Sequence, residues 1–437
     1  MAPLFFPYAS LTARADGRGP SVTAPDWPEG PELASDGAIL IDVVTGTVLY
    51  EKNIDQRFYP ASITKIMTAL LAIEKLPLGD VITYTREDIY SLEKGASTIA
   101  LRPGEELTVE ESLYGLLLAS GNECANGLAR KAGGTIAAFV EMMNARAKEM
   151  GCTGTNFVNP HGLHDENHYT TPRDMAVIMR AAITNETYLR FDSTRTHIIP
   201  ATNLVDEKRP VKMRHEMMDP YGKNYYEGVT AGKTGFTTPA GNTLVTYAVR
   251  DGVRLISVVM HSTGQQYEDT KKLLDYGFSS FQSVDASQWE NRFSAADSAD
   301  IMNIMMEDGR VDMEVTGDSW VVMPKTAAPE DLTTDIVWEA GADGSAGKIR
   351  YLYEGMEVGS ASLRLKEGTE KRFPFAVREG LYIIEADGTQ HLSIPHVVLM
   401  AAGFLLLLAA VIGILRRMSG KTEGVSFRTD RGKGHRS

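Results

Sequence analysis

A serine and a lysine, Ser62 and Lys65, begin an apolar helical pattern in the segment PASITKIMTALLAIEK (residues 60–75). Residues i and i+3 lie on one face of a helix, so the hydroxyl and the amine can form a hydrogen bond there. A helix N-terminus also offers unpaired backbone N–H groups and the positive end of the helix dipole, which favour developing negative charge. The pair therefore fits a serine nucleophile whose base is a lysine.

The same spacing also arises by chance in a chain of this length. A second copy, Ser91 and Lys94, is followed at once by Gly95 and by no apolar helix. That context is typical of a solvated loop. The non-catalytic alternative for Ser62 is an ordinary helix start that happens to contain a lysine.

Two further short motifs carry side chains that acyl transfer can use. Ser120-Gly-Asn122 ends an apolar helical pattern, where a turn can present both side chains to a cleft, although these residues are also common in ordinary turns. Lys233-Thr234-Gly235 lies in a strand pattern. A glycine inside a strand often marks the close approach of another backbone or of a ligand, and the alternative is a plain strand.

In the order Ser-x-x-Lys, Ser-x-Asn, Lys-Thr-Gly, the three motifs resemble the penicillin-binding and serine β-lactamase superfamily. Over about residues 36–281, the sequence around these motifs resembles the D-alanyl-D-alanine carboxypeptidase family, the low-molecular-mass penicillin-binding proteins. The segments that carry this likeness are YPASITKIMTAL, LLLASGNECANGLA, TNFVNPHGLHDENHYTTPRDMAVI, AGKTGFTTPAGNTLV and KKLLDYGF.

The resemblance implies a serine-type carboxypeptidase that removes the terminal D-alanine from peptidoglycan pentapeptide stems and is acylated by β-lactams. No cofactor and no metal are implied. The catalytic residues would be Ser62 as nucleophile, Lys65 as base and Ser120 as proton relay to the leaving D-alanine. The substrate-binding residues would be Asn122, Lys233, Thr234, Gly235 and Phe236, with the backbone N–H groups of Ser62 and Phe236 forming the oxyanion hole.

Two details of this assignment need explanation. A free lysine has a pKa near 10.4, so Lys65 must be shifted downward by burial and by a second cation, Lys233, to act as a base. Relatives often carry an arginine where Gln266 stands in this sequence. That departure leaves the anchoring of the substrate carboxylate open.

The elements that must position these residues predict an α+β domain. Apolar runs around Thr45-Gly46 and around Asp251-Gly252 predict one hairpin at each end of the domain. Between them, helices are predicted to start at Thr108 and at Thr171, and the first of these is expected to reach Ser120 and continue in some form to Gly133. Strands at both ends predict an antiparallel sheet built from distant residues and flanked by helices. The resemblance implies the β-lactamase/transpeptidase-like form of this fold.

The chain divides into segments of different character. We assign residues 31–285 to the catalytic domain and residues 290–393, rich in strand patterns and glycine turns, to a small all-β stalk. Residues 1–30 read as an export leader, although their start lacks basic residues. The stretch 397–415 contains no charge and predicts a transmembrane helix over 396–415.

The tail, residues 416–437, carries seven Lys/Arg against two acidic residues, which places it in the cytoplasm. The sequence therefore predicts a single-pass bacterial membrane protein, held by its C-terminal helix, with an extracytoplasmic catalytic domain. The whole chain has a net charge of −13 despite this basic tail, so nucleic acid is not an expected partner. Cys124 and Cys152 form no disulfide framework and are expected to be buried free thiols.

Four alternatives remain. His161, His164 and His168, with Asp165 and Glu166, can be read as a metal cluster, although no H-E-x-x-H pattern is present. A class A β-lactamase would need a Glu-x-x-Leu-Asn type loop, which this region does not show. A DD-endopeptidase acting on cross-links would have the same site, and a silent wall-binding scaffold would keep the fold without the activity.

Overall fold

The computed structural model describes residues 27–290, 313–315, 319–337, 345, 347–365, 377–379, 382–384 and 390–392. These residues fall into two compact units. The first contains the described residues of Met1–Glu290, Val315–Trp338 and Gly347–Leu363, and the second those of Asn291–Glu314, Glu339–Ala346 and Arg364–Ser437. All the candidate site residues lie in the first unit.

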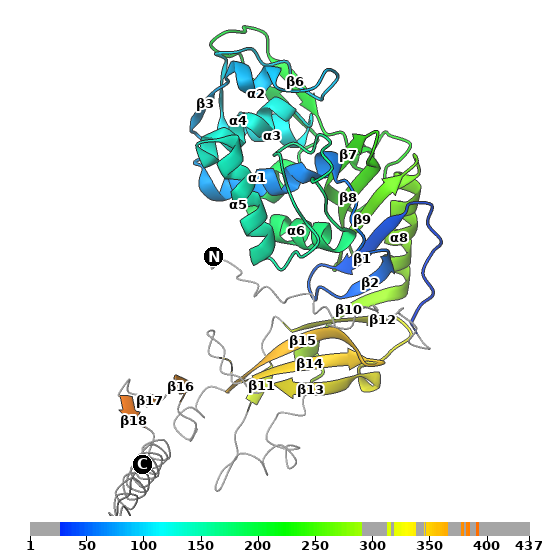
Figure 1. The fold of residues 1–437 in the computed structure, drawn as a ribbon. Coiled ribbons are helices and arrows are strands. Elements are labelled where there is room, and N and C mark those ends of the chain that lie inside the picture. Colours follow the sequence, from blue (N-terminus) through cyan, green and yellow to red (C-terminus); the bar gives the residue numbers. More distant parts are fainter. Residues whose placement is uncertain are drawn as a thin grey trace, which may run out of the picture. The chain divides into compact units, whose positions relative to one another are not determined.

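A five-stranded antiparallel sheet with the order β2-β1-β9-β8-β7 forms the centre of the first unit (Figure 1). β1 pairs with β9 along its length, with Ala38 opposite Val259, so the two ends of the domain meet in one sheet. This confirms the prediction of a sheet built from distant residues. The strands are β1 (Gly37–Asp42), β2 (Val48–Lys52), β7 (Val229–Thr237), β8 (Gly241–Arg250) and β9 (Val253–Ser262).

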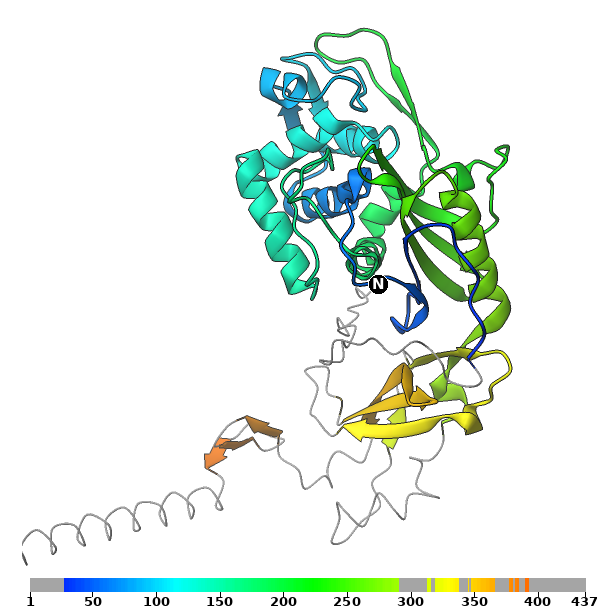
Figure 2. The ribbon, with the colours of Figure 1, turned by 45° about the vertical axis from the view of Figure 1, so that its right-hand side comes forward.

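Helices cover both faces of this sheet (Figures 1 and 2). α8 (Gln266–Ser280) packs on β8 and β9, and α6 (Pro172–Thr184) packs on β9 and β1 and contacts α1 (Lys65–Lys75). Because both faces are covered, most residues of β8 and β9 are buried instead of alternating between core and solvent. The remaining helices are α2 (Arg86–Tyr90), α3 (Val109–Leu117), α4 (Asn122–Gly133), α5 (Ile136–Glu149) and α7 (Glu186–Asp192), with the 3₁₀ turns η1 (Ala61–Thr64) and η2 (Glu216–Met218).

The predicted hairpins and helix starts are confirmed. Asp251-Gly252 joins β8 to β9, and the Thr171 side chain caps α6. Thr108 caps α3 by accepting a hydrogen bond from the Glu111 backbone N–H. The Glu111 carboxylate does not return that bond but pairs with His197 at 2.8 Å. The start of α3 therefore has half of a capping box and a tertiary contact in place of the other half.

The helix expected to run from Thr108 towards Gly133 is broken where the Ser-Gly-Asn motif lies. α3 ends at Leu117, Ser120 adopts a left-handed backbone conformation with φ of 62°, and α4 begins at Asn122. A non-glycine residue in this conformation is strained and is typical of functional turns. The break turns the chain so that both motif side chains face the same cleft.

Two small sheets complete the helical half of the first unit. β3 (Val81–Thr83) pairs with β4 (Glu106–Thr108), and β5 (Thr196–Ile199) pairs with β6 (Arg209–Lys212).

A second antiparallel sheet follows α8 without an intervening helix, with the path β10-β12-β15-β14-β13. Its first strand, β10, directly continues α8 and pairs with β12. The ring of Phe281 in β10 lies 5.0 Å from that of Trp27, measured between centroids. The strands are β10 (Phe281–Asp285), β12 (Trp320–Pro324), β13 (Thr333–Val337), β14 (Gly347–Tyr353) and β15 (Met356–Leu365), with the 3₁₀ turns η3 (Ala286–Gln288) and η4 (Pro329–Asp331) and the short strand β11 (Met313–Val315).

The second unit contains one described sheet, formed by β16 (Val377–Glu379), β17 (Tyr382–Ile384) and β18 (Gln390–Leu392). Within the ranges that the structure describes, no helix has the length and apolarity needed to cross a bilayer. The predicted leader before residue 27, the transmembrane helix 396–415 and the tail 416–437 lie outside those ranges.

Candidate active site

A cleft of about 730 Å³ lies between the helical half of the first unit and the edge of the central sheet, and it collects the predicted motifs. Ser62, Ser120 and Asn122 line it from the helical side. The segment 234–236 lines it from β7, which is the last strand of the sheet. The amines of the two motif lysines, Lys65 and Lys233, lie beneath this surface, because both side chains are buried.

Ser62 sits in a tight turn that presents its side chain at the cleft surface. The turn is η1, and α1 begins three residues later at Lys65. Ala61, directly before the serine, is buried and has a left-handed φ of 51°. Its neighbours in this turn, Ile63 and Thr64, are fully buried, so the turn is packed on every side except that of Ser62.

Lys65 is held by three oxygen atoms. Its Nζ lies 3.0 Å from Ser62 Oγ, 2.6 Å from Asn122 Oδ1 and 2.6 Å from the carbonyl oxygen of His161. Burial, followed by the positive charge of Lys233, holds the pKa of Lys65 well below its usual value. A neutral amine has two N–H groups and one lone pair. The Asn122 and His161 oxygens can only accept, so they take both N–H groups, and the lone pair then faces the Ser62 hydroxyl.

Ser120 and Asn122 lie on the helical side of the cleft, beside the Lys65 amine. The Ser120 hydroxyl is buried and has no hydrogen-bond partner in the described part of the chain. Asn122 uses its side-chain oxygen for Lys65, which leaves its NH₂ group for a ligand, and its backbone N–H donates to the Ser97 carbonyl at 2.8 Å. Among the described residues, a hydroxyl and an amide donor without bonded partners therefore lie beside the Lys65 amine.

Lys233 and the following residues form the sheet side of the cleft. Burial lowers the pKa of Lys233 to about 7, with Asp192 opposing this shift and Arg214 adding to it. Burial also raises the pKa of Asp192 to about 7. A Cβ at Gly235 would lie 2.8 Å from the backbone nitrogen of Ser62. The glycine predicted to mark a close approach does so, because only its lack of a side chain lets β7 run beside the serine.

Sequence reasoning missed one cation in the cleft. Arg214 lines it, and its Nη1 donates to Ser97 Oγ at 2.7 Å. Gln266, where relatives often have arginine, also lines the cleft at the start of α8. Arg214 lies in a loop after β6, 52 positions before Gln266 along the chain, and no local pattern in the sequence marks it.

The two inner histidines of the histidine-rich loop, His161 and His168, bond to protein groups. The residues of this loop, which all fall within the described ranges, give no group of three or more metal-binding side chains. His161 Nδ1 accepts the Leu163 N–H at 3.1 Å, and His168 Nε2 lies 2.8 Å from Thr64 Oγ1. Both rings are thus bound to protein groups, and desolvation lowers the pKa of His161 to about 3 and that of His168 to about 4.

The second Ser-x-x-Lys copy follows α2 as an exposed turn, as predicted for a solvated loop. Ser91 Oγ donates to the Glu87 carbonyl, so the serine serves its own helix end. Lys94 lines the rim of the cleft together with the rest of the segment 93–97. The segment that follows Ser91 therefore forms one wall of the cleft.

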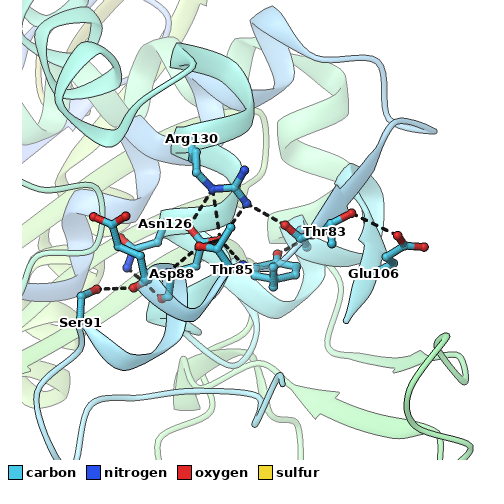
Figure 3. Close-up of polar contacts among 10 residues, drawn as sticks. Thr83, Thr85, Asp88, Ser91, Glu106, Asn126 and Arg130 are labelled. Atoms are coloured by element: carbon cyan, nitrogen blue, oxygen red, sulfur yellow. Dashed lines mark hydrogen bonds and ion pairs between the residues drawn. The ribbon is translucent and has the colours of Figure 1, made fainter. Parts of the chain in front are cut away.

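An ion pair with a buried carboxylate holds α2, and with it this wall, against α4 (Figure 3). Arg130 donates to both oxygens of Asp88 and to the Thr83 carbonyl, with the shortest contact to Asp88 at 2.7 Å. Asn126, one turn earlier on α4, donates to the Asp88 carbonyl at 3.0 Å. Since α4 begins at Asn122, one helix carries both the site residue and the anchor of the neighbouring wall.

Replacing Arg130 by methionine is expected to lower the free energy of unfolding by about 3 kcal/mol. Asp88 is fully buried and would keep only its hydrogen bonds from Thr85, and a buried carboxylate that loses its partner is strongly destabilising. Lys131→Met is the control on the same helix, because the Lys131–Asp80 pair is partly exposed and worth below about 1 kcal/mol. Urea unfolding measures both, and equal effects would contradict the prediction.

The comparisons with known proteins agree on one family. A sequence profile described as D-alanyl-D-alanine carboxypeptidase matches residues 22–264. The chain is 36% identical over 262 residues to the D-alanyl-D-alanine carboxypeptidase DacF of Bacillus subtilis, covering 57% of this chain and 64% of that protein, which is less than two thirds of its length. It is 31% identical over 294 residues to DacC of Escherichia coli, covering 64% and 67%.

The solved structures similar to this chain carry related names. Penicillin binding protein 5 from Haemophilus influenzae aligns with a TM-score of 0.63 at 26% identity, covering 77% of this chain and 98% of that chain. The Streptomyces K15 DD-transpeptidase aligns with a TM-score of 0.54 at 30% identity, covering 58% and 100%. The mixed helices and sheets described above are therefore the β-lactamase/transpeptidase-like fold.

Proposed function

Because the chain belongs to the D-alanyl-D-alanine carboxypeptidase family, we propose that it removes the terminal D-alanine from peptidoglycan pentapeptide stems through an acyl-enzyme on Ser62. The observation that carries this proposal is the 3.0 Å contact between Ser62 Oγ and the buried Lys65 Nζ, which also donates to the oxygens of Asn122 and His161. A lysine with a depressed pKa can take the serine proton at neutral pH.

In the proposed reaction, Ser62 Oγ attacks the carbonyl carbon between the two D-alanines while its proton passes to Lys65. The backbone N–H groups of Ser62 and Phe236 would bind the resulting oxyanion. Ser120, with its unpartnered hydroxyl, would pass a proton to the nitrogen of the leaving D-alanine as the C–N bond breaks. Water would then attack the ester, which releases the tetrapeptide and restores the serine hydroxyl.

The cleft also offers groups for holding the substrate. The free NH₂ group of Asn122 would donate to a carbonyl of the peptide. Lys233 and Thr234 would bind the terminal carboxylate, with Gly235 leaving room for the approach. Arg214 adds a positive charge on the same side, which compensates for the neutral Gln266. β-lactams mimic this peptide end and would acylate the same serine.

We also propose the arrangement of the chain around this site. The catalytic domain, residues 31–285, would lie outside the membrane, preceded by a leader at 1–30 and followed by the β-rich stalk of 290–393. The charge-free stretch supports a single-pass anchor at 396–415, and the seven basic residues after it support a cytoplasmic tail over 416–437.

One experiment tests the activity and separates it from its rivals. The protein is incubated with a synthetic pentapeptide ending in D-alanyl-D-alanine and, separately, with a cross-linked dimer of stem peptides. The products are identified by mass spectrometry. Loss of a single D-alanine, blocked by prior treatment with penicillin, is the expected result. Faster cleavage of the dimer would favour a DD-endopeptidase. An intact pentapeptide beside an active control enzyme, with no penicillin label, would favour a silent scaffold.

A further inference from the structure

The strained residue before the nucleophile has an unusual support. Ala61 is the residue with the left-handed φ of 51°, and the peptide group that joins it to Ser62 carries one of the two proposed oxyanion donors. In a planar trans peptide the C=O and the N–H point in opposite directions. Whatever fixes the Ala61 carbonyl therefore also aims the Ser62 N–H.

A chain of buried hydrogen bonds ends on that carbonyl. Thr64 Oγ1 lies 2.8 Å from the Ala61 oxygen and 2.8 Å from His168 Nε2. On the other side of the ring, His168 Nδ1 accepts the Val158 backbone N–H at 3.1 Å. His168 and Thr64 are both buried.

The direction of every bond in this chain is determined. Because Nδ1 accepts from Val158, the proton of the neutral ring must be on Nε2. Nε2–H then donates to Thr64 Oγ1, and the Thr64 hydroxyl donates to the Ala61 carbonyl. Thr64 precedes α1, yet its side chain does not cap that helix, because the hydroxyl points back at Ala61.

The two sides of the peptide group are consistent with this role. On the carbonyl side, Gly162, with φ of 85°, packs so closely that a Cβ there would overlap the Ala61 oxygen. On the N–H side, the Ser62 nitrogen lies beside Gly235 of β7. The preceding carbonyl, that of Pro60, is fixed separately by Thr243 Oγ1 at 2.9 Å.

We propose that Thr64 and His168 are positioning residues that hold the Ala61–Ser62 peptide group in its strained orientation and so aim the Ser62 N–H at the oxyanion. This inference rests on the proposed acyl transfer at Ser62. It does not involve the base, because Lys65 is bound by different groups of the loop, including the His161 carbonyl.

Two matched pairs of variants test the relay. Thr64→Val removes the hydroxyl at nearly constant volume, while Thr64→Ser keeps it. His168→Asn keeps an acceptor for the Val158 N–H but cannot reach Thr64, while His168→Gln can supply the distal N–H. The readouts are the acylation rate with a fluorescent penicillin, kcat and KM for the pentapeptide, and the pH dependence of acylation.

Thr64→Val and His168→Asn are expected to slow acylation by roughly 10- to 100-fold, less than the 10²–10³-fold lost when an oxyanion donor is removed outright. The loss should appear in kcat with little change in KM, because the contact acts on the transition state. Thr64→Ser and His168→Gln should recover most of the rate, and the pH dependence should keep its wild-type shape because Lys65 is untouched.

Acylation of folded Thr64→Val at the wild-type rate would overturn the inference, and so would equal losses in the valine and serine variants. If the variants do not fold, ¹⁵N NMR of the wild-type His168 ring decides, since a proton found on Nδ1 is incompatible with the relay. Absence of penicillin labelling in the wild type would instead refute the proposed function itself.

Discussion

Ser62→Ala is expected to abolish covalent labelling by penicillin and to reduce pentapeptide hydrolysis on the order of 10⁵- to 10⁶-fold. No other oxygen replaces Oγ as the atom that forms the ester, and removing the nucleophile of a cooperating set costs nearly as much as removing the whole set. The fold should persist, because Ser62 lies at the cleft surface and, among the described residues, its side chain bonds only to Lys65. Mass spectrometry of labelled tryptic peptides measures the first effect, and D-alanine release the second.

The chain supplies its own control for this experiment. Ser91 has the same spacing to a lysine, but its hydroxyl serves the end of α2. Ser91→Ala should therefore label like the wild type. Labelling that survives in Ser62→Ala, or that maps to another residue, would remove the basis of the assigned site.

Lys65→Arg is expected to slow acylation of Ser62 by about 10²- to 10⁴-fold, the usual contribution of a general base. Arginine keeps the positive charge and much of the length, but it cannot lose its proton in a protein. The substitution therefore separates the two possible roles of Lys65, because a residue needed only as a cation would tolerate it. Lys94→Arg, in the second copy, should leave acylation close to the wild-type rate.

The pH dependence of acylation provides a second test of Lys65. In the wild type the rate should rise with pH as the Lys65 ammonium loses its proton, since only the neutral amine is a base. Above about 7, where Lys233 loses its own proton, binding of a substrate carboxylate should weaken and kcat/KM for the peptide should fall. An acylation rate that falls as the pH rises through the acidic range would contradict Lys65 as the base.

Local patterns predicted most of the elements correctly because they depend on neighbouring residues. The caps at Thr108 and Thr171 and the hairpin at Asp251-Gly252 follow from short-range backbone preferences. Only half of a capping box forms at Thr108, because the Glu111 carboxylate pairs with His197, which is distant in the sequence. Tertiary contacts of that kind are not encoded in local spacing.

Only the site residues that belong to a recognisable motif could be predicted from the sequence. The three motifs named the residues that surround the Lys65 amine and the β7 edge. The sequence analysis missed Arg214, Asp192 and Thr64. Each of them acts through a contact with a residue that is distant in the sequence, and no local motif marks such a contact. His168 was noticed only as a possible metal ligand, whereas the structure turns its ring towards Thr64.

The pairing of β1 with β9 determines when the proposed site can form. β7 is held by β8, β8 by β9, and β9 by β1, whose residues are synthesised more than two hundred positions earlier. Such long-range pairing is formed slowly and late. A nascent chain that has emerged only as far as β8 already contains all three motifs, yet it has no completed sheet on which Gly235 can lie beside Ser62. We therefore expect the proposed site to form only after nearly the whole domain has left the ribosome.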